Sequence, residues 1–131
     1  MAFTEDEIVH WLLPHKGVIK SFVVNDERGT VTDFLMHYYL PSTILGRDDS
    51  LFAPYSFYNT ATSVNLTDLM RDALIIAKNG GADVFNALGL METESFLSEL
   101  KFEKGDGNLQ YYLYNWACPY MESKEVGNVL L

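Results

Sequence analysis

The sequence is short of several residue types, and each shortage excludes a class of protein. Cys118 is the one cysteine among 131 residues, so no internal disulfide can form and an intracellular, cytoplasmic location is expected. Nine Lys and Arg stand against 18 Asp and Glu, a formal net charge of -9, which argues against a nucleic-acid-binding surface. The acidic balance suits basic partners, or it serves only to keep the surface solvated.

Long apolar runs and clustered metal ligands are also absent from the sequence. No run approaches the ~18 apolar residues that a membrane span needs, so a soluble chain is expected. His10, His15 and His37 fall on a predicted helix, a loop and a strand, which gives no metal-ligand spacing. Cys118 has no nearby histidine in the sequence to activate it, and we interpret it as a small packed residue rather than a nucleophile.

What is present fits one globular domain over residues 1–131, since 48% of the residues are hydrophobic and the length allows a single core. Thr4 and Glu7 form a capping box, so a helix is expected to begin at about Glu5 and to end before Pro14. The apolar face of this helix, which is expected to pack over a sheet, consists of Ile8, Trp11 and Leu12.

The segment after this helix has the composition of β-strands. Residues 18–24 and 30–40 are rich in β-branched and aromatic residues and flank a turn-forming stretch, which predicts a β-hairpin. We interpret His37 in its second strand as a hydrogen-bonded core residue rather than a base. Residues 41–54 are interpreted as a long loop, a candidate lid or binding loop, and residues 55–59 as the next strand.

A crossover is predicted next. Asn65 is expected to cap a helix over residues 66–79, which Gly80 and Gly81 end. Residues 83–88 are interpreted as a short buried strand, and the order strand, helix, strand implies at least one parallel pair. Thr93 is expected to cap a further short helix.

Residues 105–116 place a glycine-flanked carboxylate, Asp106, before a long apolar run. This pattern predicts a tight turn that leads into a strand in the middle of the sheet. The turn would offer backbone amides and one negative charge to a ligand, or it is an ordinary hairpin turn with Asp at a common position. Residues 126–131 are apolar and strand-like, and we expect this end of the chain to be buried.

Several segments closely resemble the C-terminal half of glycylpeptide N-tetradecanoyltransferase, the N-myristoyltransferase family, and the resemblance runs from about Phe3 to the final residue. It implies a GNAT-like α/β fold, a mixed and largely antiparallel sheet flanked by helices. It also implies that an N-terminal half, which holds most of the myristoyl-CoA site, is absent here. The segments are residues 31–34, 40–44, 55–59, 83–88, 101–102 and 105–116.

The resemblance implies a function and a site. The family transfers myristate from the co-substrate myristoyl-CoA to the N-terminal glycine amine of proteins, with no covalently bound cofactor and no acyl-enzyme. Leu131 would act through its terminal carboxylate, which takes a proton from the glycine ammonium, and basic residues near the substrate's N-terminus would suit the acidic chain. The substrate-binding positions would be Ser56, Asn86, Leu88, Asp106, Gly107, Asn108, Leu109 and Leu130.

The implied partners are the peptide substrate and the N-terminal half, without which the isolated chain is expected to lack turnover and to self-associate through an exposed apolar face. Two other interpretations stay open. One is a stand-alone peptide-binding or assembly domain that uses the same groove without chemistry. The other, a complete small acetyltransferase, is disfavoured because no glycine-rich turn precedes a helix that could hold a pyrophosphate.

Overall fold

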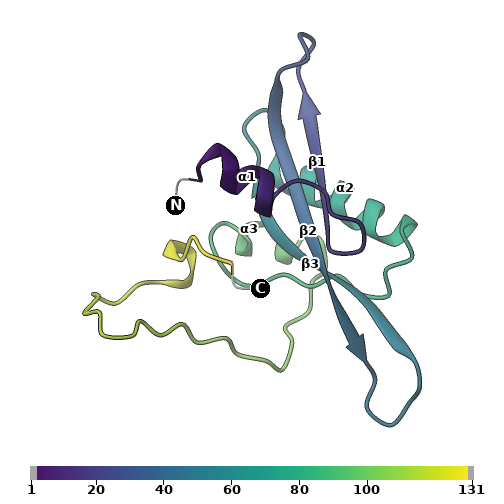
Figure 1. Ribbon diagram of the computed structural model, residues 1–131, viewed down its shortest axis with the longest axis vertical. Coiled ribbons are helices and arrows are strands. Elements are labelled where there is room, and N and C mark those ends of the chain that lie inside the picture. Colours follow the sequence, from purple (N-terminus) through teal and green to yellow (C-terminus); the bar gives the residue numbers. More distant parts are fainter. Residues whose placement is uncertain (1–2, 130–131) are drawn as a thin grey trace.

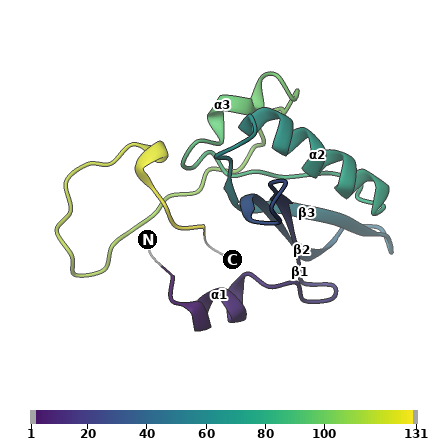
Figure 2. The ribbon, with the colours of Figure 1, turned by 90° about the horizontal axis from the view of Figure 1, so that it is seen from above.

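The structure, a computed structural model, describes residues 3–129. Three antiparallel strands form a sheet in the order β1-β2-β3, with α1 on one face and α2 and α3 on the other (Figures 1 and 2). This arrangement confirms the predicted α/β class. The elements are α1 (Glu5–Trp11), β1 (Ile19–Asn25), β2 (Val31–Thr43), β3 (Ser50–Thr60), α2 (Leu66–Asn79), α3 (Glu94–Leu97) and a 3₁₀ turn, η1 (Ser123–Glu125).

The predicted hairpin forms, as β1 and β2. The interpretation of residues 41–54 as a long loop is wrong. β2 continues to Thr43 and pairs there with Ser50 of β3, so a turn over residues 44–49 is all that separates the two strands. Pro41 does not break β2 because this part of the strand extends beyond the end of β1, where no neighbour needs its backbone N–H. The stacked rings of Tyr39 and Phe52, 4.7 Å apart, stabilise the extension.

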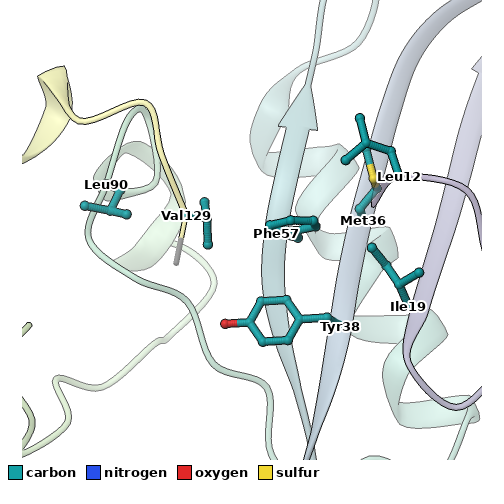
Figure 3. Close-up of a cluster of buried hydrophobic side chains, with 7 residues drawn as sticks. All are labelled: Leu12, Ile19, Met36, Tyr38, Phe57, Leu90 and Val129. Carbon is teal, nitrogen blue, oxygen red and sulfur yellow. The ribbon is translucent and has the colours of Figure 1, made fainter. Parts of the chain in front are cut away.

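Each face of the sheet carries one hydrophobic cluster, because successive side chains of β2 point to opposite faces. The second cluster, under α2 and α3, consists of Leu35, Leu69, Met70, Ala73 and Phe96. The first cluster lies on the α1 side and is drawn in Figure 3; it consists of Leu12, Ile19, Met36, Tyr38, Phe57, Leu90 and Val129.

Both predicted N-caps of the longer elements form. Thr4 and Glu7 make the reciprocal capping box of α1, and Asn65 accepts the N–H of Thr67 at 2.8 Å to cap α2. The expected packing of α1 is only partly right, since Leu12 is buried whereas Ile8 and Trp11 are exposed. A helix of only seven residues reaches the sheet through its C-terminal end, and Val129 also packs against that face.

Residues 83–88 make a parallel contact, as predicted, but not a buried strand. The contact is a single bridge between Tyr55 and Asn86, and Val84 is exposed. The bridge is short because the chain turns away from β3 after Asn86, towards α3. At α3, Phe96 is fully buried, while the predicted cap, Thr93, makes no side-chain capping bond.

The predicted central strand over residues 105–116 is wrong. This segment forms no strand and, with residues 117–121, makes an extended arm that leaves the body of the molecule (Figure 1). Tyr112 is 86% exposed and Trp116 is 74% exposed. A central strand needs a strand on each side, and within residues 3–129 nothing pairs with the arm.

The arm also carries Cys118, which is exposed, so its interpretation as a packed residue is wrong as well. Residues 126–129 return to the body without forming a strand, yet Val129 is buried, as expected for this end of the chain. Among residues 3–129, no helix is both long and apolar enough to cross a membrane.

Candidate substrate groove

A hollow of about 1430 Å³ opens between the body of the molecule and the segment that follows α3. It is larger than a typical small-molecule pocket and open along one side, which suits an extended polymer such as a peptide. Five of the predicted substrate-binding residues line it, from two separate parts of the chain. They are Asn86, Leu88, Gly107, Asn108 and Leu109.

The other predicted site residues lie elsewhere. Asp106 is exposed beside the hollow without lining it, and Ser56 is buried in β3 next to its wall. Leu130 and Leu131 lie outside the described residues, so the predicted terminal base is not placed. The described part of the chain leads to it, since residues 126–128 line the same hollow.

Ser56 helps to fix the wall of the hollow rather than facing into it. Its backbone N–H donates to the carbonyl of Asn86 at 2.8 Å, and its hydroxyl accepts from the side-chain amide of Asn59 at 2.9 Å. The same Asn59 side chain accepts the N–H of Met36 at 3.2 Å. The serine therefore connects the centre of the sheet to Asn86, which does line the hollow.

The chain makes a bend at Asp106 rather than the predicted tight turn, and this bend is open. A Cβ built on Gly105 or Gly107 would meet no atom within 4 Å, so neither glycine is needed to relieve crowding inside the chain. The carboxylate of Asp106 is exposed at the start of the arm. It can receive a cationic or hydroxyl group of a ligand that lies along the hollow without first giving up an internal hydrogen bond.

A β-bulge in β3 brings a tyrosine to the C-terminal segment. Leu35 pairs with Asn59 and His37 pairs with Ser56, so β3 has one residue more than β2 over this interval. The extra residue lets Phe57 and Tyr58 both pack against the first cluster, with ring centroids 4.5 Å apart. Sequence reasoning missed this feature because the partners of Tyr58 lie 70 residues further along the chain.

The hydroxyl of Tyr58 contacts the last residues that the structure describes. It donates to the side-chain oxygen of Asn128 at 3.4 Å and accepts the N–H of Val129 at 3.2 Å. The hydroxyl of Tyr111 donates to the backbone carbonyl of Asn128 at 2.9 Å. Two tyrosines, from β3 and from the arm, thus hold one short segment at the edge of the hollow.

Asp33 is a second residue that sequence reasoning missed. It is fully buried at the start of β2, and a carboxylate in so apolar a strand was the available signal. Burial would raise its pKa, but hydrogen bonds from Ser63, Thr32 and Thr62 outweigh that effect and hold the pKa well below its ordinary value. The carboxylate accepts the backbone N–H groups of Thr62, Ser63 and Val64 and the hydroxyls of Thr32 and Ser63.

His37 is the core residue that the sequence predicts. It is fully buried on the α2 side of the sheet, where its Nε2 lies 3.0 Å from the hydroxyl of Tyr39. Burial, and secondarily the charge of Lys20, lowers its pKa to about 4. It is therefore neutral at pH 7 and does not line the hollow, so it is not a candidate base.

The low pKa of His37 makes the stability of the fold depend on pH. Between its ordinary value of 6.5 and the folded value of about 4, the unfolded chain takes up a proton that the folded chain excludes. Stability is therefore complete above pH 6.5 and is lost as the pH falls towards 4. Using ~1.4 kcal/mol per pKa unit, we expect the free energy of unfolding to fall by about 2 kcal/mol between pH 7 and pH 5.

Urea unfolding of the wild-type chain and of His37→Phe at both pH values tests this dependence. The variant should lose most of the difference between pH 7 and pH 5, because it cannot take up the proton. An equal loss of stability in both proteins would assign the pH dependence to other groups.

The fold has known counterparts. Over 85% of this chain and 82% of its own, the structure is similar to ribosomal-protein-alanine N-acetyltransferase from Brucella melitensis, with a TM-score of 0.58. The sequences are only 14% identical, so this similarity concerns the fold alone. The fold is that of the GNAT-type acyltransferases, an α/β fold whose antiparallel sheet is flanked by helices.

The family is narrower than the class. The family model described as Myristoyl-CoA:protein N-myristoyltransferase, C-terminal domain, matches residues 1–129, and the chain belongs to this family. It is 59% identical to glycylpeptide N-tetradecanoyltransferase 2 of Bos taurus over 128 residues, which are 96% of this chain and 26% of the bovine protein.

Solved structures of N-myristoyltransferases are also similar to this chain. Saccharomyces cerevisiae N-myristoyltransferase with bound myristoyl-CoA is similar with a TM-score of 0.73 and 34% identity, over 81% of this chain and 29% of the yeast chain. The chain therefore spans roughly a quarter to a third of the length of such relatives. Within residues 3–129, no group of three His, Cys, Asp or Glu residues lies close enough to hold a metal ion.

Proposed function

We propose that this chain supplies the peptide-binding half of an N-myristoyltransferase. The complete enzyme would transfer the fourteen-carbon acyl group of myristoyl-CoA to the N-terminal glycine amine of protein substrates. The observation that carries the proposal is the family match over residues 1–129. The hollow supports it, because residues from two separate parts of the chain that the family resemblance marks as peptide-binding line one surface.

The substrate peptide would lie along this hollow with its N-terminal glycine at the end near Asn128. Asn86 and Asn108 offer amide groups to the peptide backbone, and Leu88 and Leu109 offer apolar contact. Asp106 would face a hydroxyl or a basic residue a few positions into the substrate. The net charge of -9 favours substrates with lysines there, because it attracts cationic peptides at long range.

The base would be the terminal carboxylate of Leu131. A free α-amino group has a pKa of ~7.7–8.0 and is mostly protonated at pH 7, so it must lose a proton before it can attack. The ammonium proton passes to the carboxylate, and the amine nitrogen bonds to the thioester carbonyl carbon. The carbon–sulfur bond then breaks, the nitrogen gives up its second proton, and CoA leaves as the thiol with that proton on its sulfur. Leu130 would line the pocket beside the carboxylate.

The groups that bind CoA and polarise the thioester would come from a complementary N-terminal part. We propose the cytoplasm as the location of the reaction. The arm supports this assembly, since Tyr112, Tyr114 and Trp116 expose large apolar surfaces and extended backbone without a partner in residues 3–129. We propose that the arm pairs with that N-terminal part. Alone, residues 1–131 would fold as one domain, lack turnover and self-associate through the arm.

A chimera tests this function. In it, this chain replaces the matching 26% of the bovine relative. We expect the chimera to acylate a peptide with an N-terminal glycine from myristoyl-CoA, and the purified 131-residue chain to bind the peptide without turnover. Acylation by the isolated chain would contradict the need for a complementary part. Peptide binding without transfer in the chimera would favour the alternative, a binding domain without chemistry.

The role of Asp106 has its own test in the chimera. For a peptide with lysines near its N-terminus, Asp106→Asn should raise KM by about 3- to 10-fold and leave kcat unchanged, because an exposed charge contributes ~1 kcal/mol to binding. Asp48→Asn, on the exposed β2–β3 turn, is the matched control. An equal change in KM for a peptide without lysines would exclude charge recognition by Asp106.

A further inference from the structure

The C-terminal segment is held by groups that come from distant parts of the chain. Asn128 and Val129 share three hydrogen bonds with Tyr58 and Tyr111, one of them through the N–H of Val129. Val129 is also buried in the first cluster, and Figure 3 shows it between Leu90 and Phe57. The segment is therefore fixed by both polar and apolar contacts, whereas most of the arm that precedes it is exposed.

The position of Tyr58 depends on the bulge in β3, which is a specific structural feature. Without the extra residue, Phe57 and Tyr58 would point to opposite faces of the sheet. The ring of Tyr58 is further fixed by an edge contact with Phe3, with centroids 5.5 Å apart. Bulges often re-aim a side chain next to an active site, and here the re-aimed hydroxyl contacts the segment that leads to the proposed base.

The distance from this anchor to the end of the chain is short. Two residues follow Val129, and two extended residues reach at most about 7 Å. In the proposed function, an anchor at Val129 would therefore limit how far from it the Leu131 carboxylate can lie. A base that abstracts a proton must be held within about 3 Å of it, so this confinement affects the rate more than it affects peptide binding.

We infer that Tyr58 and Tyr111 are positioning residues for the terminal carboxylate of Leu131. They form a clamp, defined here as their two hydroxyls on Asn128 and Val129. The inference rests on the proposed function for its catalytic consequence. The clamp itself is a contact of described residues, so the two parts can be tested separately.

The first test measures the clamp without any activity. Amide hydrogen exchange is followed at Val129 in the 131-residue chain and in Tyr58→Phe, which keeps the ring and its contact with Phe3. The variant should exchange at Val129 about 3- to 10-fold faster, the effect of one lost hydrogen bond. Tyr39→Phe is the matched control: it also removes a hydroxyl with a bonding partner, but on the opposite face, and should leave Val129 unchanged.

The second test measures catalysis in the chimera. Tyr58→Phe and Tyr111→Phe should each lower kcat several-fold, and the double variant on the order of 10-fold or more, with KM for the peptide unchanged. A general loss of stability would not produce this separation of kcat from KM. Tyr39→Phe again serves as the control and should keep kcat.

Each outcome decides a part of the inference. Unchanged exchange at Val129 in Tyr58→Phe would overturn the clamp, whatever the activity. Faster exchange with an unchanged kcat in both single variants and in the double variant would overturn the positioning role and leave the proposed function standing. An inactive chimera would overturn the proposed function, and the catalytic role of the tyrosines with it, while the exchange result would still establish or exclude the clamp.

Discussion

Adding one residue after Leu131 in the chimera is expected to lower kcat by about 10²- to 10⁴-fold, the range for loss of a positioned general base. The added residue moves the free carboxylate by one residue, about 3.5 Å, and puts a neutral peptide carbonyl in its place. The glycine ammonium would then keep its proton and could not attack the thioester. Single-turnover acylation at pH 7 measures this effect without interference from product release.

Two controls separate the loss of the base from a general disturbance. Leu131→Ile changes the side chain but keeps the carboxylate in place, and it should retain most of the activity. Converting the terminal carboxylate to a carboxamide by protein ligation removes the charge without moving the chain end, and it should inactivate the enzyme as strongly as the extension. Full activity in the carboxamide protein would exclude the carboxylate as the base.

Replacing Asp33 with alanine is expected to have the largest effect on stability, lowering Tm by on the order of 10 °C or more. The substitution leaves the backbone N–H groups of Thr62, Ser63 and Val64 without the acceptor they share. These residues form the turn between β3 and α2, so the start of α2 would lose its position over the second cluster. Thermal unfolding followed by circular dichroism measures the change.

Asp26→Ala is the matched control for Asp33→Ala. Asp26 also accepts two backbone N–H groups, from Arg28 and Thr30, but it is exposed in the β1–β2 turn, where water can replace it. It should lower Tm by only a few degrees. Similar losses in the two variants would show that the burial of Asp33 has no special role.

The stabilisation by Asp33 and that by neutral His37 are lost in different ranges of pH. The folded pKa of Asp33 lies below its ordinary value, so its stabilisation is present above that value and is lost only as the pH falls below about 4. The loss due to His37 lies at higher pH, between 6.5 and about 4. Asp33→Ala should therefore be destabilised already at pH 7, and the two groups can be told apart by pH alone.

Local patterns predicted the elements that depend on neighbouring residues. The capping box of Thr4 and Glu7 and the asparagine cap of α2 were predicted at the residues where they form, because a cap is a contact over two or three positions. The β1–β2 hairpin was predicted for the same reason. The burial of His37 also followed from its place in an apolar strand, although its partner Tyr39 was not predicted.

The errors occurred where a distant partner decides the outcome. Residues 105–116 have the composition of a central strand, but a strand needs neighbours, and within residues 3–129 none is available to it. Residues 41–54 have the prolines of a loop, yet they continue a hairpin. Pro41 is tolerated there because the pairing of β2 with β1 reaches only to Tyr38, and beyond it β2 pairs with β3 alone. Composition gives the propensity of a segment, and hydrogen bonding to a partner decides whether that propensity is realised.

By itself the sequence determined the family and the fold class, and it predicted candidate residues for the groove, because these depend on the order of residues along the chain. Only the tertiary structure brought Asn86, Leu88 and residues 107–109 to one hollow, and only it set Tyr58 against Val129 across 71 positions of sequence. The reason is physical. A contact between distant residues forms only after the sheet, its bulge and the returning chain are in place, and no short-range pattern encodes all three.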